Sequence, residues 1–441
     1  MVAVNPSGQI RRLVVFVEHF PPFLGSDRSV FELARRVAEN GIRVTFIAVQ
    51  PLRYLLGRRP DDWPYKKNWE RPPPKVHPNI DAHYLLVDRY LQRLWRWLRP
   101  FAFLLTTMLF TAYSLKIIAD SRSQIVVSAH ASPLLGIVSF LAAKLTLRPL
   151  IMMCPDWMSA YAATLAKTSM SSLGPVLLQF TEYFLYRLSN RVLVVTDYLK
   201  RLLVKMGVPE RKVAVIPNGV DTKVFTPSVD ASEVIDKYRL RGRVVILFAG
   251  HLEDWAGVPT LYNLAVRLDR DYPEAVILLV GTGESSNVLI NRLIGSNLGH
   301  TLVHAGLQPF DKMPAFNAAA DITLCMFPNS ALSHAASPLK LFEYMAAGTA
   351  VVTTRVAGTM EVVDDSVCVL VRPDNEQDFC DAVVSLCKDP DRRSKLGSRA
   401  RTLVEKKYSW DILSRQFLRE CERIALPYIP KRPFHFKEAD A

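Results

Sequence analysis

The sequence predicts an α/β protein with two parallel β-sheets in tandem. Short apolar runs without a charge recur along the chain, which is typical of strands covered on both faces. Segments with helical periodicity lie between these runs, so strands and helices alternate. The chain has 441 residues, and 49% of them are hydrophobic. Because this length exceeds what a single core usually serves, two domains are favoured.

The first half of the chain begins with a strand–helix–strand unit. Residues 13–17 are uniformly apolar, residues 29–40 carry apolar side chains at helical spacing, and residues 44–49 form another apolar run. Gly41 marks the end of the helix. Residues 58–79 are rich in proline and charge, so we expect a surface excursion there. Further strands are expected at residues 125–127, 150–153, 191–195 and 213–216, with a helix at residues 134–145.

A second series of strands and helices begins near residue 244. Its strands are expected at residues 244–249, 275–280, 301–305, 322–325 and 350–353, and its first helix at residues 258–267. We therefore predict a first lobe over residues 1–195 and a second over residues 196–410. A C-terminal helix within residues 411–441 is expected to return to the first lobe. Two lobes facing across a cleft would place ligand sites in the loops beyond the carboxyl ends of the strands.

The charge balance and the cysteines narrow the class of protein. The formal net charge is +13, and a basic protein attracts nucleic acid, anionic membranes or phosphorylated small molecules. The sequence has no zinc-ligand spacing, aromatic single-strand signature or basic zipper, so nucleic acid is not an expected partner. The six cysteines form no C-x-x-C pair, which favours a reducing, cytoplasmic compartment. The apolar run at residues 13–17 is too short for a signal-peptide core.

The segment from Ser337 to Gly348 carries the strongest chemical pattern. Ser337 is a helix-capping residue and Pro338 suits the first helical position, so a helix is predicted to start here and to end before Gly348. Its free N–H groups and its dipole would suit a phosphate. Lys340 and Glu343 lie on one helical face, where they could hold a diphosphate and a ribose diol. A capped helix with a surface ion pair would give the same pattern.

This segment resembles the donor-site helix of family 4 glycosyltransferases, which have the GT-B fold of two Rossmann-like lobes. Six further motifs agree with the family in order and spacing over nearly the whole chain. They are residues 20–25 after the first strand, Ser128-Ala129-His130, Ile216-Pro-Asn-Gly-Val-Asp221, Val280-Gly-Thr-Gly283, Gly358-Thr-Met-Glu361 and Tyr408-Ser-Trp410. The resemblance implies transfer of a sugar, with retention, from a nucleotide-diphosphate sugar to a glycan or lipid-linked acceptor in polysaccharide or glycolipid biosynthesis. It implies no cofactor and no bound metal.

The resemblance also implies roles for residues of the donor helix. Glu343 would accept hydrogen bonds from the ribose hydroxyls. The backbone of Ser337, Pro338 and Leu339, together with Lys340, would hold the diphosphate and stabilise its charge. Lys340 is therefore a candidate for catalysis as well as for donor binding.

Residues in four other loops take roles by the same resemblance. Gly25 would let the backbone of its loop approach the donor phosphate or the acceptor, and His251 and Gly283 would lie at the donor. His130 would lie near the transferred sugar, since it follows the carboxyl end of a strand. Asp156, in Cys154-Pro-Asp156-Trp157, would orient an acceptor hydroxyl or act as its base. A loop aspartate that caps a helix is an equally good reading of Asp156.

Three positions depart from the family pattern. His251 and Ala256 stand where the family usually has an arginine and a lysine that clamp the departing diphosphate, and Ala335 replaces a glutamate that contacts the sugar. Because stabilising the leaving group's charge is a main source of catalysis, we expect Lys340 to carry more of this role. The departures leave two alternatives open. One is a catalytically weakened homologue that acts as a binding or scaffold subunit, and the other is a GT-B sugar-nucleotide epimerase.

A stretch in the first lobe suggests contact with a membrane. Arg89, Arg93 and Arg96 lie at helical spacing among leucine and tryptophan residues, and residues 100–115 carry no charge. A spanning helix needs about 20 apolar residues. We therefore expect an interfacial basic helix and an apolar helix that dips into the inner leaflet without crossing it, which would suit a polyprenyl-linked acceptor. An ordinary core helix is the alternative.

Overall fold

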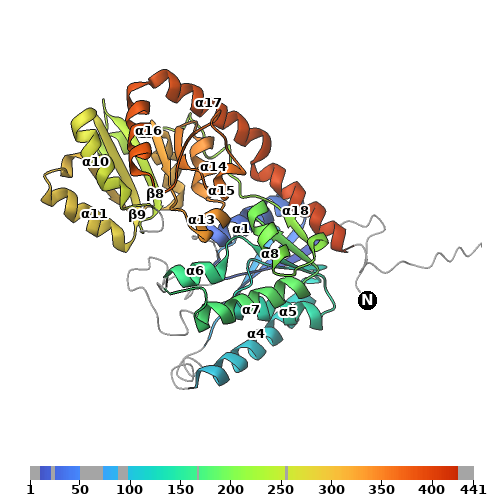
Figure 1. Cartoon of the computed structure of the whole chain (residues 1–441). Helices are drawn as coiled ribbons and strands as arrows, with labels where there is room; N and C mark the ends of the chain where they lie inside the picture. The colour runs from blue at the N-terminus through green and yellow to red at the C-terminus, as the bar shows by residue number, and fades with distance from the viewer. Residues whose placement is uncertain are drawn as a thin grey trace, which may run out of the picture. The chain divides into compact units, whose positions relative to one another are not determined.

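The computed structural model describes residues 10–20, 25–49, 73–87, 98–165, 168–253 and 257–425. The chain divides into two compact units. The first unit comprises residues 1–154, 180–193 and 414–441, and the second comprises residues 155–179 and 194–413. Figure 1 shows that both units are built from a sheet with helices packed on it. The expected α/β class is confirmed.

The first sheet has seven strands in the order β3-β2-β1-β4-β5-β6-β7. They are β1 (Arg12–Val17), β2 (Arg43–Val49), β3 (Ile80–Leu85), β4 (Ile125–Ser128), β5 (Leu150–Cys154), β6 (Arg191–Val194) and β7 (Val213–Val215). Leu13 of the central strand β1 pairs in parallel with Val44 on one side and Ile125 on the other. Sequence reasoning missed β3, because this edge strand alternates buried and exposed residues and has no apolar run.

Helices connect these strands in the expected alternation. They are α1 (Gly25–Glu39), α4 (Arg99–Ser121), α5 (Pro133–Leu145), α6 (Met158–Leu165), α7 (Leu173–Leu188), α8 (Asp197–Lys205) and α18 (Trp410–Ala425). Helix α1 begins four residues before the expected start at residue 29, because its first turn is polar and gives no apolar periodicity. Arg191 of β6 pairs with Glu420 of α18, with 2.6 Å between Nε and Oε2. This buried ion pair anchors the end of α18 in the first unit.

The second sheet has six strands in the order β10-β9-β8-β11-β12-β13. They are β8 (Val244–His251), β9 (Ala275–Thr282), β10 (Leu302–Gly306), β11 (Ile322–Cys325), β12 (Ala350–Thr354) and β13 (Val369–Val371). The recorded pairings in this sheet are all parallel. Each strand predicted beyond residue 244 is present within three residues of its expected bounds. The sheet therefore has the doubly wound form in which ligands bind at the carboxyl ends of the strands.

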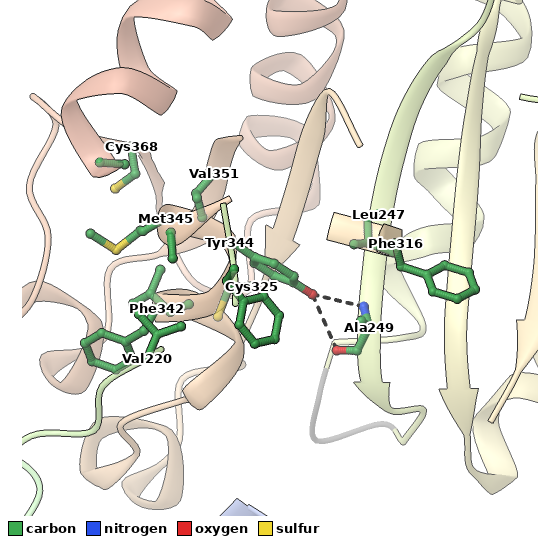
Figure 2. Packing of buried hydrophobic residues seen from close by; sticks show 14 of the residues in the cluster. Val220, Leu247, Ala249, Phe316, Cys325, Phe342, Tyr344, Met345, Val351 and Cys368 are labelled. Atoms are coloured by element: carbon green, nitrogen blue, oxygen red, sulfur yellow. Dashed lines mark hydrogen bonds between the residues drawn. The ribbon is translucent and has the colours of Figure 1, made fainter. Parts of the chain in front are cut away.

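The helices of the second unit pack against two core clusters, one on each face of the sheet. They are α9 (Ser232–Lys237), α10 (Thr260–Asp271), α11 (Glu284–Gly295), α12 (Met313–Ala318), α13 (Ala331–Ala335), α14 (Leu339–Ala346), α15 (Ala357–Met360), α16 (Glu376–Lys388) and α17 (Pro390–Lys407). Helix α14 lies at the centre of one core cluster. Figure 2 shows Phe342, Tyr344 and Met345 of this helix packed among side chains of the sheet.

Tyr344 fixes α14 to the central strand of the second sheet. Its ring is fully buried, and its hydroxyl accepts a hydrogen bond from the Ala249 N–H at 3.0 Å (Figure 2). Burial raises the pKa of the Tyr344 hydroxyl well above its ordinary value. The hydroxyl therefore stays neutral and serves as a hydrogen-bonding anchor for α14.

All six cysteines are free and buried. Burial raises the pKa of Cys325 to about 11 and that of Cys368 to about 12. The interpretation of the cysteines as small buried hydrophobic residues is confirmed.

Candidate active site

The segment that leads into α14 is extended rather than helical. Helix α13 ends at Ala335, and Ala336 and Pro338 have extended backbones. The helix begins at Leu339, and no side chain caps it. The predicted cap at Ser337 and the predicted first helical position at Pro338 are both wrong. A residue before proline is disfavoured in helical conformation, so Ser337 stays outside the helix.

Two side chains hold this extended segment in place. Thr196 Oγ1 donates a hydrogen bond to the Ala335 carbonyl at 3.2 Å. Asn218 Nδ2 donates to the Ser337 carbonyl at 2.5 Å. Asn218 belongs to the Ile216–Asp221 motif, so this motif positions the segment before α14. Sequence reasoning identified the motif but did not identify the contact.

The start of α14 presents hydrogen-bond donors that the protein does not use. Within the described part of the chain, the main-chain N–H groups of Leu339 and Lys340 have no acceptor. The Ser337 Oγ is buried and also has no partner there. Unpaired N–H groups at a helix start carry partial positive charge and bind anions. The arrangement is therefore suited to a phosphate group.

Lys340 places an ammonium group at the carboxyl end of β8. Its Nζ lies 4.3 Å from the ring centroid of Phe248 and 5.8 Å from that of Phe327. A Cβ atom built on Gly250 would lie 3.8 Å from the same Nζ. The pKa of Lys340 is lowered because burial disfavours its charge, although Cys325 and Glu343 act in the opposite direction. A diphosphate beside this side chain would restore the charge that burial opposes.

Glu343 lies one turn after Lys340 and is half-buried. Its carboxylate is close enough to favour the charged form of Lys340. Lys340 and Glu343 therefore lie near each other, one turn apart on α14. The ribose contact assigned to Glu343 stays a prediction.

The loops after β8 and β9 meet at close range. His251 is the last residue of β8 and is exposed. A Cβ atom on Gly283 would lie only 2.2 Å from the Leu252 carbonyl oxygen, so only glycine fits the turn after β9. Ala256, where the family has a lysine, lies outside the described residues. The two loops border the end of the sheet at which Lys340 lies.

Two residues of the Gly358–Glu361 motif contact other parts of the second unit. Glu361 accepts hydrogen bonds from the N–H groups of Asp197 and Tyr198, at 2.6 and 2.8 Å, and so caps α8. A Cβ atom on Gly358 would lie 1.9 Å from the Ala336 carbonyl oxygen. Both residues support the extended segment that precedes α14. Contacts between residues so far apart in the sequence cannot be predicted from its periodicity.

His334 supports the same segment from its other side. Its Nδ1 accepts a hydrogen bond from the Ala357 N–H at 3.0 Å. Its Nε2 therefore carries the proton and donates to Asn329 Oδ1 at 2.9 Å. The ring stacks on Tyr198 at 5.8 Å between centroids. His334 is therefore a positioned side chain next to Ala335, where the sequence resemblance implies a glutamate.

In the first unit, His130 belongs to a buried cluster of histidines and carboxylates at the carboxyl ends of β1 and β4. Asp27 accepts hydrogen bonds from His19 Nδ1 at 2.8 Å and from the His19 N–H at 3.0 Å. His130 Nε2 lies 3.8 Å from Asp27 Oδ1 and 3.9 Å from Glu18 Oε1. Sequence reasoning predicted only His130. The position of Glu18 and His19 directly after the first strand was the signal that could have identified them.

The charges in this cluster are coupled. Burial raises the pKa of Asp27, but the hydrogen bond and charge of His19, with the charge of His130, outweigh it and lower the pKa overall. Asp27 is therefore an anion that orients His19 and faces His130. The Nδ1 atom of His130 is buried, and the described residues offer it no hydrogen-bond partner. A buried polar atom of this kind is available to a ligand.

The remaining two candidates are Gly25 and Asp156. Gly25 is the first residue of α1. Asp156 is half-buried in the turn between β5 and α6. It belongs to the second unit, in which α6 packs against α13. The roles expected for Gly25 and Asp156 stay predictions.

Comparison with known protein families identifies the family to which this chain belongs. The family described as Glycosyltransferase Family 4 matches residues 24–224, and the family described as Glycosyl transferases group 1 matches residues 231–403. The chain belongs to the family 4 glycosyltransferases. The expected family and the GT-B fold with two Rossmann-like domains are thus confirmed.

Similar proteins are named as glycosyltransferases. An uncharacterized glycosyltransferase of Methanocaldococcus jannaschii is 22% identical over 242 residues, which are 54% of this chain and 60% of the relative. A GDP-mannose-dependent alpha-(1-6)-phosphatidylinositol monomannoside mannosyltransferase of Mycobacterium tuberculosis is 27% identical over 274 residues, which are 60% of this chain and 71% of the relative. The matched region spans 60% of the archaeal relative's length and 71% of the mycobacterial relative's length.

Solved structures share the fold over almost their whole length. Anabaena HepE in complex with UDP and glucose has a TM-score of 0.68 and 16% identity, and the match covers 94% of this family 4 glycosyltransferase and 99% of HepE. Sucrose-phosphate synthase from Thermosynechococcus elongatus has a TM-score of 0.69 and 16% identity, with 94% and 99% covered. At this identity the likeness establishes the fold.

Proposed function

We propose that this protein transfers a sugar, with retention of anomeric configuration, from a nucleotide-diphosphate sugar to a glycan or lipid-linked acceptor. The reaction would serve cell-surface polysaccharide or glycolipid biosynthesis on the cytoplasmic side of the membrane. The observation that carries the proposal is the set of unused donors at the start of α14. There, the N–H groups of Leu339 and Lys340 and the hydroxyl of Ser337 have no described partner, and the Lys340 ammonium lies nearby.

The donor diphosphate would bind at the start of α14. Its oxygens would accept hydrogen bonds from the two free N–H groups and from Lys340. Glu343, one turn further along the helix, would accept hydrogen bonds from the ribose hydroxyls. His251 and Gly283, in the loops after β8 and β9, would border the same phosphate groups.

Leaving-group stabilisation would depend mainly on Lys340. As the bond from the anomeric carbon to the diphosphate breaks, negative charge grows on the departing oxygen. A cation held in a partly desolvated site stabilises such charge more strongly than it would in water. The phenylalanine rings beside Lys340 keep the ammonium in this position. The helix N-terminus adds a second, fixed source of positive potential.

The acceptor is proposed from His130 of the first unit, from Asp156 of the second unit and from the named relatives. His130, with its unpaired buried Nδ1, would contact the transferred sugar, and Asp156 would orient the acceptor hydroxyl. A relative from Mycobacterium tuberculosis is named for a mannosyl transfer to a phosphatidylinositol monomannoside, which supports a lipid-linked acceptor. HepE was solved with UDP and glucose, whereas the mycobacterial relative is named for GDP-mannose. The nucleotide is therefore left to experiment.

Calorimetry with UDP, GDP, UDP-glucose and GDP-mannose tests the donor site. We expect one nucleotide series to bind, and we expect Lys340→Ala and Glu343→Ala each to lose that binding. Lys406→Ala is the matched control, because Lys406 is an exposed lysine of α17 in the same unit. Unchanged affinity in both site variants would refute the donor site.

Turnover separates an enzyme from a scaffold. Release of free nucleotide from each nucleotide sugar would be measured with and without a lipid extract. Release that requires a particular sugar nucleotide and rises with the lipid extract supports transfer to a lipid-linked acceptor. Binding without release across the panel would favour the scaffold alternative.

A further inference from the structure

Helix α4 buries Ala102, Phe110 and Ile118, but part of its surface has the reverse of the polarity expected for a core helix. The side chains that it buries include hydroxyl residues, namely Thr106, Thr107, Thr111 and Ser114. Those that it exposes include Phe101, Leu104, Met108 and Tyr113, each between 56% and 61% exposed. Thr107 and Ser114 can be buried because each hydroxyl donates to a carbonyl of its own helix, at 2.8 and 2.7 Å. In a helix that only serves the core, the apolar stripe faces inward.

Helix α7 shows the same reversal in the part that belongs to the first unit. Glu182 and Tyr186 are buried, each with 1% exposure. Phe180, Phe184 and Leu188 lie at helical spacing and are exposed. The rings of Phe180 and Phe184 pack edge to face with their centroids 4.5 Å apart. Exposed apolar side chains therefore occur on two helices of the first unit and are not confined to α4.

The two reversed helices lie in one layer, with α5 between them. Helix α4 packs along α5, and Gly136 of α5 lies against Leu185 of α7, where a Cβ atom would come within 2.6 Å of Cδ1. Crossovers between parallel strands are right-handed, and α4, α5 and α7 all lead in the same direction across the sheet, so they cover the same face. Figure 1 shows the three helices on one side of the first unit.

Together these side chains form a surface that we call the apolar helix face. It consists of Phe101, Leu104, Met108 and Tyr113 of α4 and Phe180, Phe184 and Leu188 of α7. Large exposed apolar side chains gathered on helices of one layer are typical of a surface that binds a partner.

The borders of the apolar helix face are cationic. Lys116 of α4, Lys144 of α5 and Arg187 of α7 are all exposed. Lys144 lies over the ring of Phe140, and Arg187 lies over the ring of Tyr183, at 5.5 and 5.9 Å from the centroids. Cations that lie over aromatic rings at the edge of an apolar surface match the interface of a bilayer with anionic headgroups.

The sheet excludes a membrane-spanning role for α4. This helix has 23 residues, and an 18-residue window within it has a mean hydropathy of 1.7, which would suffice for a span. However, it connects β3 to β4, and both strands belong to one parallel sheet. A spanning helix would place these strands on opposite sides of the bilayer. If α4 meets a membrane, it must therefore lie along the membrane surface.

We propose that the apolar helix face docks this protein onto a lipid bilayer that contains anionic lipids. Phe101, Leu104 and Met108 of α4 and Phe180 and Phe184 of α7 would enter the interface, and the bordering cations would contact the headgroups. The docking deepens the proposed function, since a lipid-linked acceptor would be reached from the membrane surface. The basic stretch of Arg89, Arg93 and Arg96 lies outside the described residues, and the docking face does not depend on it.

Vesicle flotation tests the proposal with matched variants. The full chain is mixed with vesicles of phosphatidylcholine containing phosphatidylglycerol, or of phosphatidylcholine alone. We expect the wild-type protein to float with the anionic vesicles. We expect Leu104→Ser/Met108→Ser and Phe180→Ser/Phe184→Ser each to reduce its partition by about tenfold. Val288→Ser/Ile294→Ser is the control, because it removes two exposed apolar side chains from α11 in the second unit and is expected to float like the wild type.

Two further measurements show why a variant fails to float with the vesicles. Circular dichroism melting and nucleotide binding in the absence of vesicles show that each variant is folded and that its donor site is intact, so a failure of docking is distinguishable from a failure of the proposed function. Wild-type protein that does not float, or α4 and α7 variants that float like it, would overturn the proposal. So would a dimer in solution that the same substitutions dissociate, because the face would then bind a second copy.

Discussion

Asn218 donates a hydrogen bond from Nδ2 to the Ser337 carbonyl at 2.5 Å, and this bond joins the turn at residues 216–221 to the start of α14. Both residues are buried. The bond holds the segment whose free N–H groups face the proposed diphosphate. Donor binding should therefore depend on a residue that never touches the donor.

Asn218→Ala leaves the buried Ser337 carbonyl without its donor. We expect the free energy of unfolding to fall by about 1–3 kcal/mol, and we expect nucleotide affinity to fall by about tenfold because the start of α14 is released. Urea denaturation and calorimetry measure the two effects. Asn287→Ala, at an exposed position of α11, should change neither. An Asn218→Ala protein with full nucleotide affinity would contradict the positioning role.

Gly283→Ala tests the close approach of the loops after β8 and β9. The added methyl group would lie 2.2 Å from the Leu252 carbonyl oxygen, so the two loops must separate. We expect a loss of about 1–3 kcal/mol in the free energy of unfolding, together with weaker nucleotide binding. Gly295→Ala, at the end of the adjacent helix α11, meets nothing within 4 Å and should be neutral or slightly stabilising. Equal effects of the two substitutions would show that loop contact is not the cause.

Lys340 should make diphosphate affinity depend on pH in the alkaline range. Its pKa is lowered below the ordinary 10.5 by burial, so the free protein loses this positive charge at a lower pH than an exposed lysine would. Affinity for the nucleotide diphosphate should fall as the pH rises through that lowered pKa. Lys340→Arg, whose side chain stays charged, should bind with an affinity that is flat over the same range. A wild-type affinity that does not change between pH 7 and pH 10 would argue against the contact.

Asp27 should contribute to stability except at low pH. Its pKa in the folded protein is lowered from the ordinary 3.8, so its contribution is present above pH 3.8 and is lost as the pH falls through the folded-state pKa. Asp27→Asn should therefore lower the free energy of unfolding at pH 7 by about 2 kcal/mol. In acid, the free energies of unfolding of the variant and of the wild-type protein should become more similar. Urea midpoints measured from pH 3 to pH 7 provide the comparison. A difference that stays constant with pH would mean that the charge of Asp27 is not involved.

The buried thiols should not react in the native protein. The pKa of Cys325 is raised to about 11 and that of Cys387 to about 12, so at pH 8 on the order of one thiol in a thousand or fewer is ionised at these sites. A disulfide-exchange reagent at pH 8 should label none of the six cysteines until urea is added, after which it should label all of them. Stoichiometric labelling of one native thiol would identify a cysteine whose burial is incomplete.

The apolar runs were sufficient to predict most of the strands. Those that begin at Leu13, Val244 and Ile322 are buried on both faces, so their sequence has no polar interruption and the pattern is unambiguous. Edge strand β3 lacks this signal because one of its faces meets water. The cap at Ser337 was predicted wrongly because local preference favoured it, whereas contacts from Thr196 and Asn218 hold the chain extended there.

The sequence by itself determined the α/β class, the family resemblance, and the presence of Lys340 and Glu343 on one helical face. These properties follow from residue type and local spacing, which folding does not alter. The tertiary structure alone decided that the start of α14 is left with unused N–H groups and that Asp27, His19 and His130 meet. It also decided that α4 and α7 expose their apolar sides. These properties depend on partners that are distant in the chain, and no local pattern records which groups will be satisfied when the chain is packed.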